Sequence, residues 1–218
     1  MCEYNHGNDS GWDNSTVFSV LPPIATPELQ AFLIIQMDVL SDLAKRIGQD
    51  QDAVIWNQKA SHMTDILFRH MFQNGLPIAR KSGTQEIIEN DSLLPYLCIV
   101  LGDRLPDTIR TSMLTVLSGD RFRTAHGFAT ESPHSPFYRD DGYWRGPIWA
   151  PSTMLLADGL YQCHQETLAR EIASQFASMV QKSGFAENFD ARTGMGLRDR
   201  AYTWTSSVFL ILTHTFLT

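Results

Sequence analysis

Apolar residues recur at three- and four-residue spacing through most of this 218-residue chain, and this period predicts a largely helical protein. The clearest stretch follows Thr26, which suits an N-cap, and Pro27, which suits the first helical position. Gly48 is expected to stop this helix. A second helix is predicted from about residue 52 to residue 72, because Asn74-Gly75 breaks the pattern directly afterwards.

The rest of the chain continues the same pattern and carries few strand signals. Ser92 is expected to cap a short apolar helix that stops near Gly102. The polar, mixed segment 78–90 is expected to be a loop or a short hairpin. Further helices are predicted over residues 106–119, 151–164, 166–182 and 200–216. We therefore expect one all-α domain over residues 1–218, built from about seven helices that stack as hairpins.

The longest segment without a helical pattern runs from residue 120 to residue 147 and is rich in Gly, Pro and aromatic residues. A loop of this length in a compact domain usually carries function. Four of the five tryptophans lie in or beside predicted loops, namely Trp12, Trp144, Trp149 and Trp204. Of the five tryptophans, only Trp56 is expected to be a core residue. The loops are therefore predicted to form a functional rim.

Composition disfavours several classes of function. The chain carries a net charge of −7 and no Lys/Arg cluster, which argues against a nucleic-acid partner or an anionic membrane surface. No apolar run of about 18 residues occurs, so no transmembrane helix is expected. The cysteines and histidines form no CxxC or HExxH pattern, and no nucleotide-binding glycine motif is present. We expect a cytoplasmic protein that needs neither a metal nor an organic cofactor.

Two acidic residues in aromatic, glycine-containing loops are the candidates for chemistry. Asp13 lies in the segment 11–15, and Glu187 lies in the segment 184–194. Carboxylates among Trp, Phe and Asn are typical of a sugar site, because aromatic faces meet the ring, amides bind hydroxyls and two acids handle protons. The competing interpretation places Asp13 in an Asx-turn and Glu187 on the surface beside a helix end.

A third candidate segment covers residues 138–149. Tyr143, Trp144 and Trp149 offer flat faces to a sugar ring, and Arg145 carries several donors for hydroxyls or a carboxylate. The competing interpretation is a packed aromatic loop in which Arg145 stacks on Trp144.

Together these segments resemble the mannosylglycerate-hydrolase-like glycoside hydrolases, which are related to glycoside hydrolase family 63 and more distantly to trehalases. The resemblance is carried, in the family's order, by residues 6–15, 142–152, 187–190 with 193–194, and 199–205. It covers nearly the whole chain, and the four segments together are far more specific than any one of them.

The resemblance implies an (α/α)6 barrel of six outer and six inner helices, with the active site at one end. It also implies inverting hydrolysis of an α-glucosidic or α-mannosidic bond, without a metal or organic cofactor. Asp13 matches the family's general acid, and Glu187 matches its general base. The residues that match its sugar-pocket segments are Trp12, Asn14, Tyr143, Trp144, Arg145, Trp149 and Trp204, with Tyr202 less firmly placed.

The chain departs from the family in length, because about seven predicted helices correspond to only the C-terminal half of such a barrel. The expected partners are therefore a carbohydrate substrate and either a second copy of the chain or a missing N-terminal half that completes the barrel. The alternative function is a non-catalytic carbohydrate-binding or inactive half-barrel. A sugar phosphorylase or epimerase on a similar barrel is a further alternative, although Glu187 argues against a phosphorylase.

Overall fold

The computed structural model describes residues 1–218, and helices make up most of it. The six α-helices are α1 (Pro27–Arg46), α2 (Asp50–His70), α3 (Asp107–Ser118), α4 (Ala150–Gln162), α5 (Glu166–Ser183) and α6 (Thr203–Phe216). Three 3-10 segments add η1 (Gly7–Ser10), η2 (Thr16–Ser19) and the longer η3 (Leu94–Arg104). Each predicted helix therefore has a counterpart, and the expectation of an all-α architecture is confirmed.

The termini of α1 follow the local signals in the sequence. Thr26 is the N-cap residue, with extended backbone angles of φ −130° and ψ 148°. Its hydroxyl donates to the Glu28 carboxyl at 2.5 Å rather than to a backbone group. At the other end Gly48 has a φ of 75°, and the amides of Gly48 and Gln49 close the last turn on the carbonyls of Lys45 and Ala44. A left-handed glycine thus ends the helix as predicted.

The apolar run after Ser92 forms the 3-10 segment η3 instead of an α-helix. The Ser92 hydroxyl accepts a hydrogen bond from the Leu94 amide at 3.2 Å, but the N-cap residue of this segment is Leu93, so the predicted cap lies one residue too early. The segment kinks at Gly102, whose φ is 54° and ψ −126°. A Cβ on Gly102 would lie 2.6 Å from the Cβ of Gln162, so only glycine permits the end of α4 to approach this closely.

Seven strands of two or three residues tie the loops together. They are β1 (Ile24–Ala25), β2 (Phe72–Gln73), β3 (Leu76–Pro77), β4 (Ala79–Lys81), β5 (Ile87–Ile88), β6 (Asn188–Phe189) and β7 (Gly196–Leu197). β4 and β5 form an antiparallel hairpin within the segment 78–90. β1 pairs with the other edge of β4. β2 pairs with β3 and β6 pairs with β7, so all three small sheets are antiparallel.

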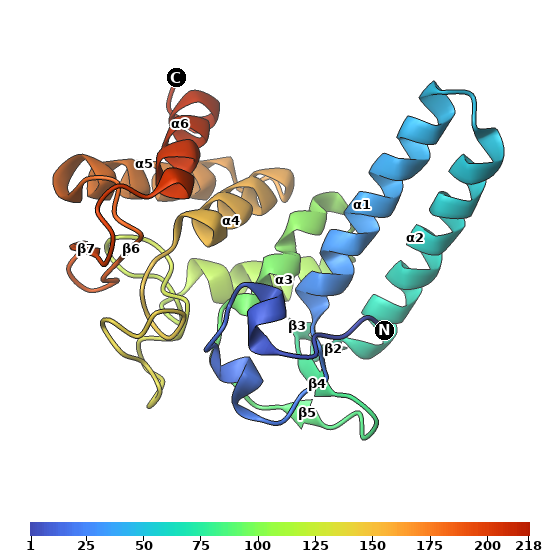
Figure 1. Ribbon diagram of the computed structural model, residues 1–218, viewed down its shortest axis with the longest axis horizontal. Coiled ribbons are helices and arrows are strands. Elements are labelled where there is room, and N and C mark those ends of the chain that lie inside the picture. The colour runs from blue at the N-terminus through green and yellow to red at the C-terminus, as the bar shows by residue number, and fades with distance from the viewer.

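The helices pack as hairpins along an open arc (Figure 1). α1 packs antiparallel against α2 at one end of the arc and contacts η3, which in turn contacts α4. α4 also packs against α5 and α6, which form the other end. The N-terminal segment runs beneath the arc, on the side that carries the long loops (Figure 1). The arc thus brings the first residues close to loops that occur more than 100 residues later.

The distribution of tryptophans in the core is the reverse of the expectation. Trp12, Trp144 and Trp149 belong to the buried core, with exposed fractions of 6%, 3% and 0%. Trp56 is only partly buried and does not belong to that core, and the Lys59 amine lies 4.4 Å above its ring. The prediction of a buried Trp56 is therefore wrong, because its helix covers the core with smaller residues such as Ala53.

Both ends of the arc expose apolar side chains. Val39 and Leu43 of α1 are 52% and 48% exposed and share one stripe of the helix, and Ile47, directly after its last residue, is 72% exposed. On α6 Leu210 and Ile211 are 65% and 46% exposed. No neighbouring helix covers these two surfaces, so both leave apolar side chains in contact with solvent. No helix combines the length and the apolar composition that crossing a membrane requires.

Glu28, in the first turn of α1, is a fully buried carboxyl group. One oxygen accepts from Thr26, and the other has no hydrogen-bond partner. Burial raises the pKa of Glu28 from 4.5 to about 8. Because the folded-state pKa lies above the unfolded value, this group favours folding at low pH, and that advantage is lost as the pH rises from 4.5 through about 8.

Glu28→Gln is therefore expected to stabilise the protein selectively at high pH. We expect little difference in Tm from the unmodified chain at pH 4.5, and a Tm higher by about 5 to 10 °C at pH 9. Thermal unfolding followed by circular dichroism at both pH values measures this. Glu89→Gln, at an exposed position, is the matched control. Equal pH dependence of the chain and of Glu28→Gln would contradict the assignment.

Candidate active site

The Asp13 loop is held close to the preceding turn by a glycine. A Cβ on Gly7 would lie 2.3 Å from the Asp13 carbonyl oxygen, so η1 can pack on this backbone only without a side chain there. The Trp12 amide donates to the Ser10 hydroxyl at 3.0 Å, and the Ser15 amide donates to the Trp12 carbonyl at 2.9 Å. The Asp13 carboxylate is half-buried and forms no hydrogen bond or ion pair with the protein. This arrangement argues against an Asx-turn role and leaves the carboxylate available.

Glu187 occupies the short connection between α5 and β6. Gly184, with a φ of 76°, turns the chain out of α5. The Glu187 amide donates to the Asp199 carbonyl at 2.7 Å, and the Thr205 hydroxyl donates to the Ala186 carbonyl at 2.7 Å. These contacts fix the backbone on both sides of the residue, while its half-buried carboxylate has no partner in the protein. The backbone of Glu187 is thus held by hydrogen bonds on both sides, while its carboxylate is unpaired.

The phenol of Tyr143 is affected by the negative charges of both Asp13 and Glu187. Burial raises the pKa of the Tyr143 phenol, and the negative charges of Asp13 and then Glu187 raise it further. Both carboxylates are therefore close enough to act on one hydroxyl group, although they are separated widely in the sequence. The backbone of Tyr143 has a φ of 63°, an uncommon value for a residue other than glycine, and such outliers are concentrated at functional sites.

Arg198 is a further member of this site that the sequence did not reveal. Its guanidinium lies 5.2 Å above the Tyr143 ring, and its positive charge opposes the rise in the pKa of that phenol. It also pairs with Asp141 at 2.8 Å. The partner of this aspartate lies 57 residues away, so no local signal indicates the pair.

The aromatic residues predicted for the sugar pocket form one continuous cluster. Trp144 stacks on Trp12 at 4.6 Å and on Trp149 at 4.1 Å between ring centroids. Trp149 meets the rings of Tyr143 at 5.0 Å and Trp204 at 5.5 Å, edge to face in both cases. The ring faces of the three stacked tryptophans are therefore largely covered by one another. Direct contact of these three rings with a sugar stays a prediction.

Two indole groups in this cluster lack hydrogen-bond partners. The Trp149 Nε1 donates to the Tyr143 carbonyl at 2.8 Å. The Nε1 atoms of Trp144 and Trp204 are buried without any acceptor. An unsatisfied buried donor is costly and rare, so a polar group such as water or a ligand hydroxyl is expected beside these atoms.

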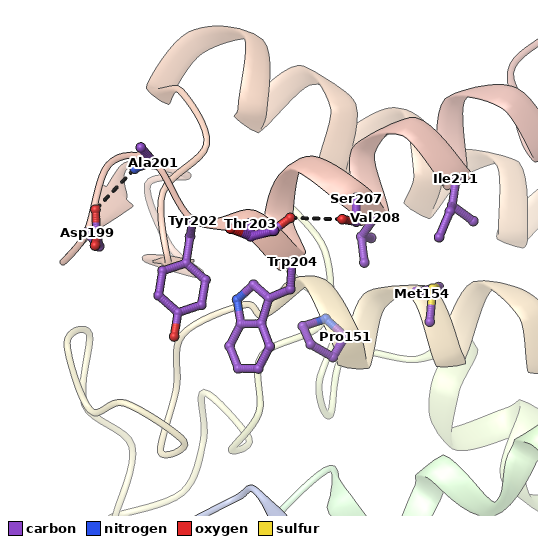
Figure 2. A pocket seen from close by; sticks show the side chains of 10 residues that line it. All are labelled: Pro151, Met154, Asp199, Ala201, Tyr202, Thr203, Trp204, Ser207, Val208 and Ile211. Atoms are coloured by element: carbon purple, nitrogen blue, oxygen red, sulfur yellow. Dashed lines mark hydrogen bonds between the residues drawn. The ribbon is translucent and has the colours of Figure 1, made fainter.

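An open cavity of about 710 Å³ lies between α4 and the start of α6. Figure 2 shows the rings of Tyr202 and Trp204 projecting from the start of α6, with Pro151 of α4 beside Trp204. Neither Asp13 nor Glu187 lines this cavity, but it includes Asp199, whose carbonyl binds the Glu187 amide. The cavity continues along α6 as far as Ile211, one of the two exposed apolar residues of that helix.

Asn14 and Arg145 serve to join two loops in the structure. The Asn14 amide donates to the Gly142 carbonyl and accepts from the Trp144 amide, each at 3.0 Å. The Arg145 Nε donates to the Asn14 carbonyl at 2.5 Å. Arg145 does not stack on Trp144, and both polar side chains contact protein groups. A direct role of Asn14 and Arg145 in binding a sugar stays a prediction.

Solved structures identify this fold. A glycoside hydrolase family 63 mannosylglycerate hydrolase from Thermus thermophilus, solved in complex with glucose, matches 99% of this chain with a TM-score of 0.83 at 19% identity. The neutral trehalase of Saccharomyces cerevisiae matches 88% of the chain with a TM-score of 0.72 at 17% identity. The fold is thus that of the helical-barrel glycoside hydrolases, and the expected (α/α)6-barrel type is confirmed.

Sequence comparison then defines the family. The chain belongs to the mannosylglycerate hydrolase MGH1-like glycoside hydrolase domain family, whose sequence model matches residues 2–205. A mannosylglycerate hydrolase of Thermus thermophilus is 30% identical over 81 residues, which cover 37% of this chain and 20% of that protein. The chain spans 62% of the mannosylglycerate hydrolase structure and 38% of the trehalase structure, so both relatives extend well beyond it.

Proposed function

We propose that this chain carries the catalytic pair of an inverting α-glycosidase, with Asp13 as general acid and Glu187 as general base. The observation that carries the proposal is that the negative charges of both carboxylates raise the pKa of the Tyr143 phenol, while neither carboxylate has a partner in the protein. Carboxylates that serve structure alone are normally hydrogen-bonded or paired when they are half-buried. Free carboxylates beside an aromatic cluster fit a site that handles protons on a sugar.

The mechanism transfers two protons in opposite directions. Glu187, ionised, takes a proton from a water molecule as its oxygen attacks the anomeric carbon. Asp13, protonated, gives its proton to the glycosidic oxygen as the bond from that oxygen to the anomeric carbon breaks. The products are an alcohol and a sugar with inverted anomeric configuration, and the attacking water needs a separation of roughly 6.5–9.5 Å between the two carboxyl groups.

The accessible members of the aromatic cluster are the proposed sugar contacts. Tyr143, Tyr202 and Trp204 are only partly buried, and Tyr202 and Trp204 line the open cavity. The rings of Tyr202 and Trp204 lie 5.0 Å apart, which offers a broad apolar face to a sugar ring. We propose glucose or mannose as the glycone, with glycerate or another sugar as the aglycone.

The stereochemistry of the product tests this function. The chain is incubated with α-mannosylglycerate or the corresponding α-glucoside, and the reducing sugar is followed by proton NMR before it mutarotates. We expect the β-anomer to form first, since inversion of an α-linked substrate requires it. Initial formation of the α-anomer would refute the inverting mechanism.

A second candidate is a carbohydrate-binding half-barrel without catalysis, which the exposed stripes on α1 and α6 favour. In that case a second copy of the chain or a separate N-terminal half supplies the remaining helices before turnover is possible. Isothermal calorimetry with the same glycosides decides between the candidates. Binding without release of sugar would favour this second function.

The proposal includes a cytoplasmic location, in keeping with three free cysteines of which Cys98 and Cys163 are buried.

A further inference from the structure

Glu131 is a fully buried acidic residue that the proposed mechanism does not use. It lies in the long loop between α3 and α4 and forms no ion pair. Its Oε2 accepts from the Thr16 hydroxyl and its Oε1 accepts from the Ser135 hydroxyl, each at 2.7 Å. One bond stays within the loop, whereas the other reaches a residue 115 positions earlier in the chain. The carboxylate therefore joins the two halves of the site.

Thr16 is the last of three consecutive residues that are attached to distant segments. Asn14 binds backbone groups of Gly142 and Trp144 and the side chain of Arg145. The Ser15 hydroxyl lies 2.8 Å from the Ser92 hydroxyl in a buried hydrogen bond. Asp13 comes directly before these three attachments. Its own carboxylate has no protein partner, so its position depends on the backbone that they hold.

Burial of Glu131 has an energetic cost that its contacts reduce only in part. Burial raises the pKa of Glu131 most strongly, and the negative charge of Asp91 adds to the rise. The two hydroxyl donors and the Arg145 guanidinium lower it. A buried carboxylate without a paired cation is costly, and apolar residues of similar size commonly stabilise a fold as well or better. Stability alone therefore does not explain an acid at this position.

We propose that Glu131 is a positioning residue, which holds Thr16 and thereby orients Asp13 toward the bound sugar. This inference rests on the proposed role of Asp13 as the general acid. An acid must stay within hydrogen-bond reach of the leaving oxygen, and a shift of about 1 Å can lower the rate roughly 100-fold. A buried acceptor that binds two hydroxyls at fixed distances supplies such a constraint.

Amide hydrogen exchange tests the positioning role without reference to catalysis. Thr16→Val removes the hydroxyl that Glu131 binds and keeps the shape, whereas Thr16→Ser keeps the hydroxyl. The probes are the Ser15 and Phe18 amides, which donate to the Trp12 and Ser15 carbonyls. We expect exchange at both amides to quicken at least tenfold in Thr16→Val and to stay within about twofold in Thr16→Ser, with unchanged amides in α5. Unchanged exchange in Thr16→Val would overturn the proposal.

Kinetics and a second set of variants separate positioning from general destabilisation. We expect Thr16→Val and Glu131→Ala to lower kcat about 10- to 100-fold with KM changed less than about threefold, and Thr16→Ser to recover most of the loss. Ser135→Ala, which leaves the bond to Thr16 intact, is expected to have a much smaller effect. Equal effects of Ser135→Ala and Thr16→Val on exchange would contradict the specific link to the Asp13 loop. Absence of hydrolysis by the unmodified chain would count against the proposed function, while the exchange experiment would still decide the role of Glu131.

Discussion

Glu187→Gln is expected to lower kcat by about 10²–10⁴-fold on every glycoside, including substrates with good leaving groups. The amide keeps the size of the side chain but cannot take a proton from water, so attack on the anomeric carbon slows whatever group departs. Steady-state rates with an α-glycosyl fluoride and with a natural α-glycoside measure this. Glu166→Gln, an exposed substitution at the other end of α5, is the control and should leave both rates unchanged.

A nucleophile that needs no deprotonation provides a direct test of the same role. With Glu187→Ala, added azide is expected to attack the anomeric carbon and to give a β-glycosyl azide at a restored rate. Circular dichroism shows whether this variant is folded. A folded Glu187→Ala variant that retained hydrolysis without azide would exclude Glu187 as the base.

Asp13→Asn is expected to produce a loss that depends on the leaving group. An ordinary alkoxide departs slowly without a proton, so kcat should fall about 10²–10⁴-fold on a natural α-glycoside. Fluoride departs without protonation, and we expect the rate on an α-glycosyl fluoride to fall by less than about tenfold. The contrast between the two substrates separates the acid from the base, because Glu187→Gln should slow both.

The matched control for Asp13→Asn is Asp140→Asn, an exposed aspartate in the loop that faces the Asp13 segment. We expect near-normal rates on both substrates for this control. An equal loss on the fluoride and on the natural glycoside in Asp13→Asn would mean that Asp13 has another role, such as holding the substrate.

The helices of this chain could be predicted well from the sequence because their signals are local. The bounds of α1 follow from Pro27 and Gly48, and the hairpin of β4 and β5 lies within the segment for which a hairpin was one option. The tryptophans could not be placed in this way. Periodicity compares only neighbours along the chain, whereas Trp12, Trp144 and Trp149 become buried by stacking on residues from distant segments.

The two acidic residues of the candidate site could be selected from the sequence, whereas the long-range contacts around them could not. The roles of Asp13 and Glu187 were predicted from residue type and from the family resemblance and stay predictions, and in the structure the charges of both raise the pKa of the Tyr143 phenol. The contacts that hold them have no sequence signature, since Arg198 and Glu131 bind partners 57 and 115 residues away. Such pairings depend on the folded topology, which neither composition nor spacing encodes.

The link between Asn14 and Arg145 has a consequence for how the protein matures. It connects residues 131 positions apart, and closing so long a loop carries an entropic penalty that only a nearly complete tertiary structure offsets. Intermediates with intact helices but undocked ends would therefore lack a placed Asp13, the residue that we propose as the proton donor, because this link forms only when the two loops meet. Enzymatic activity would then report the final docking step, well after far-ultraviolet signals have levelled off.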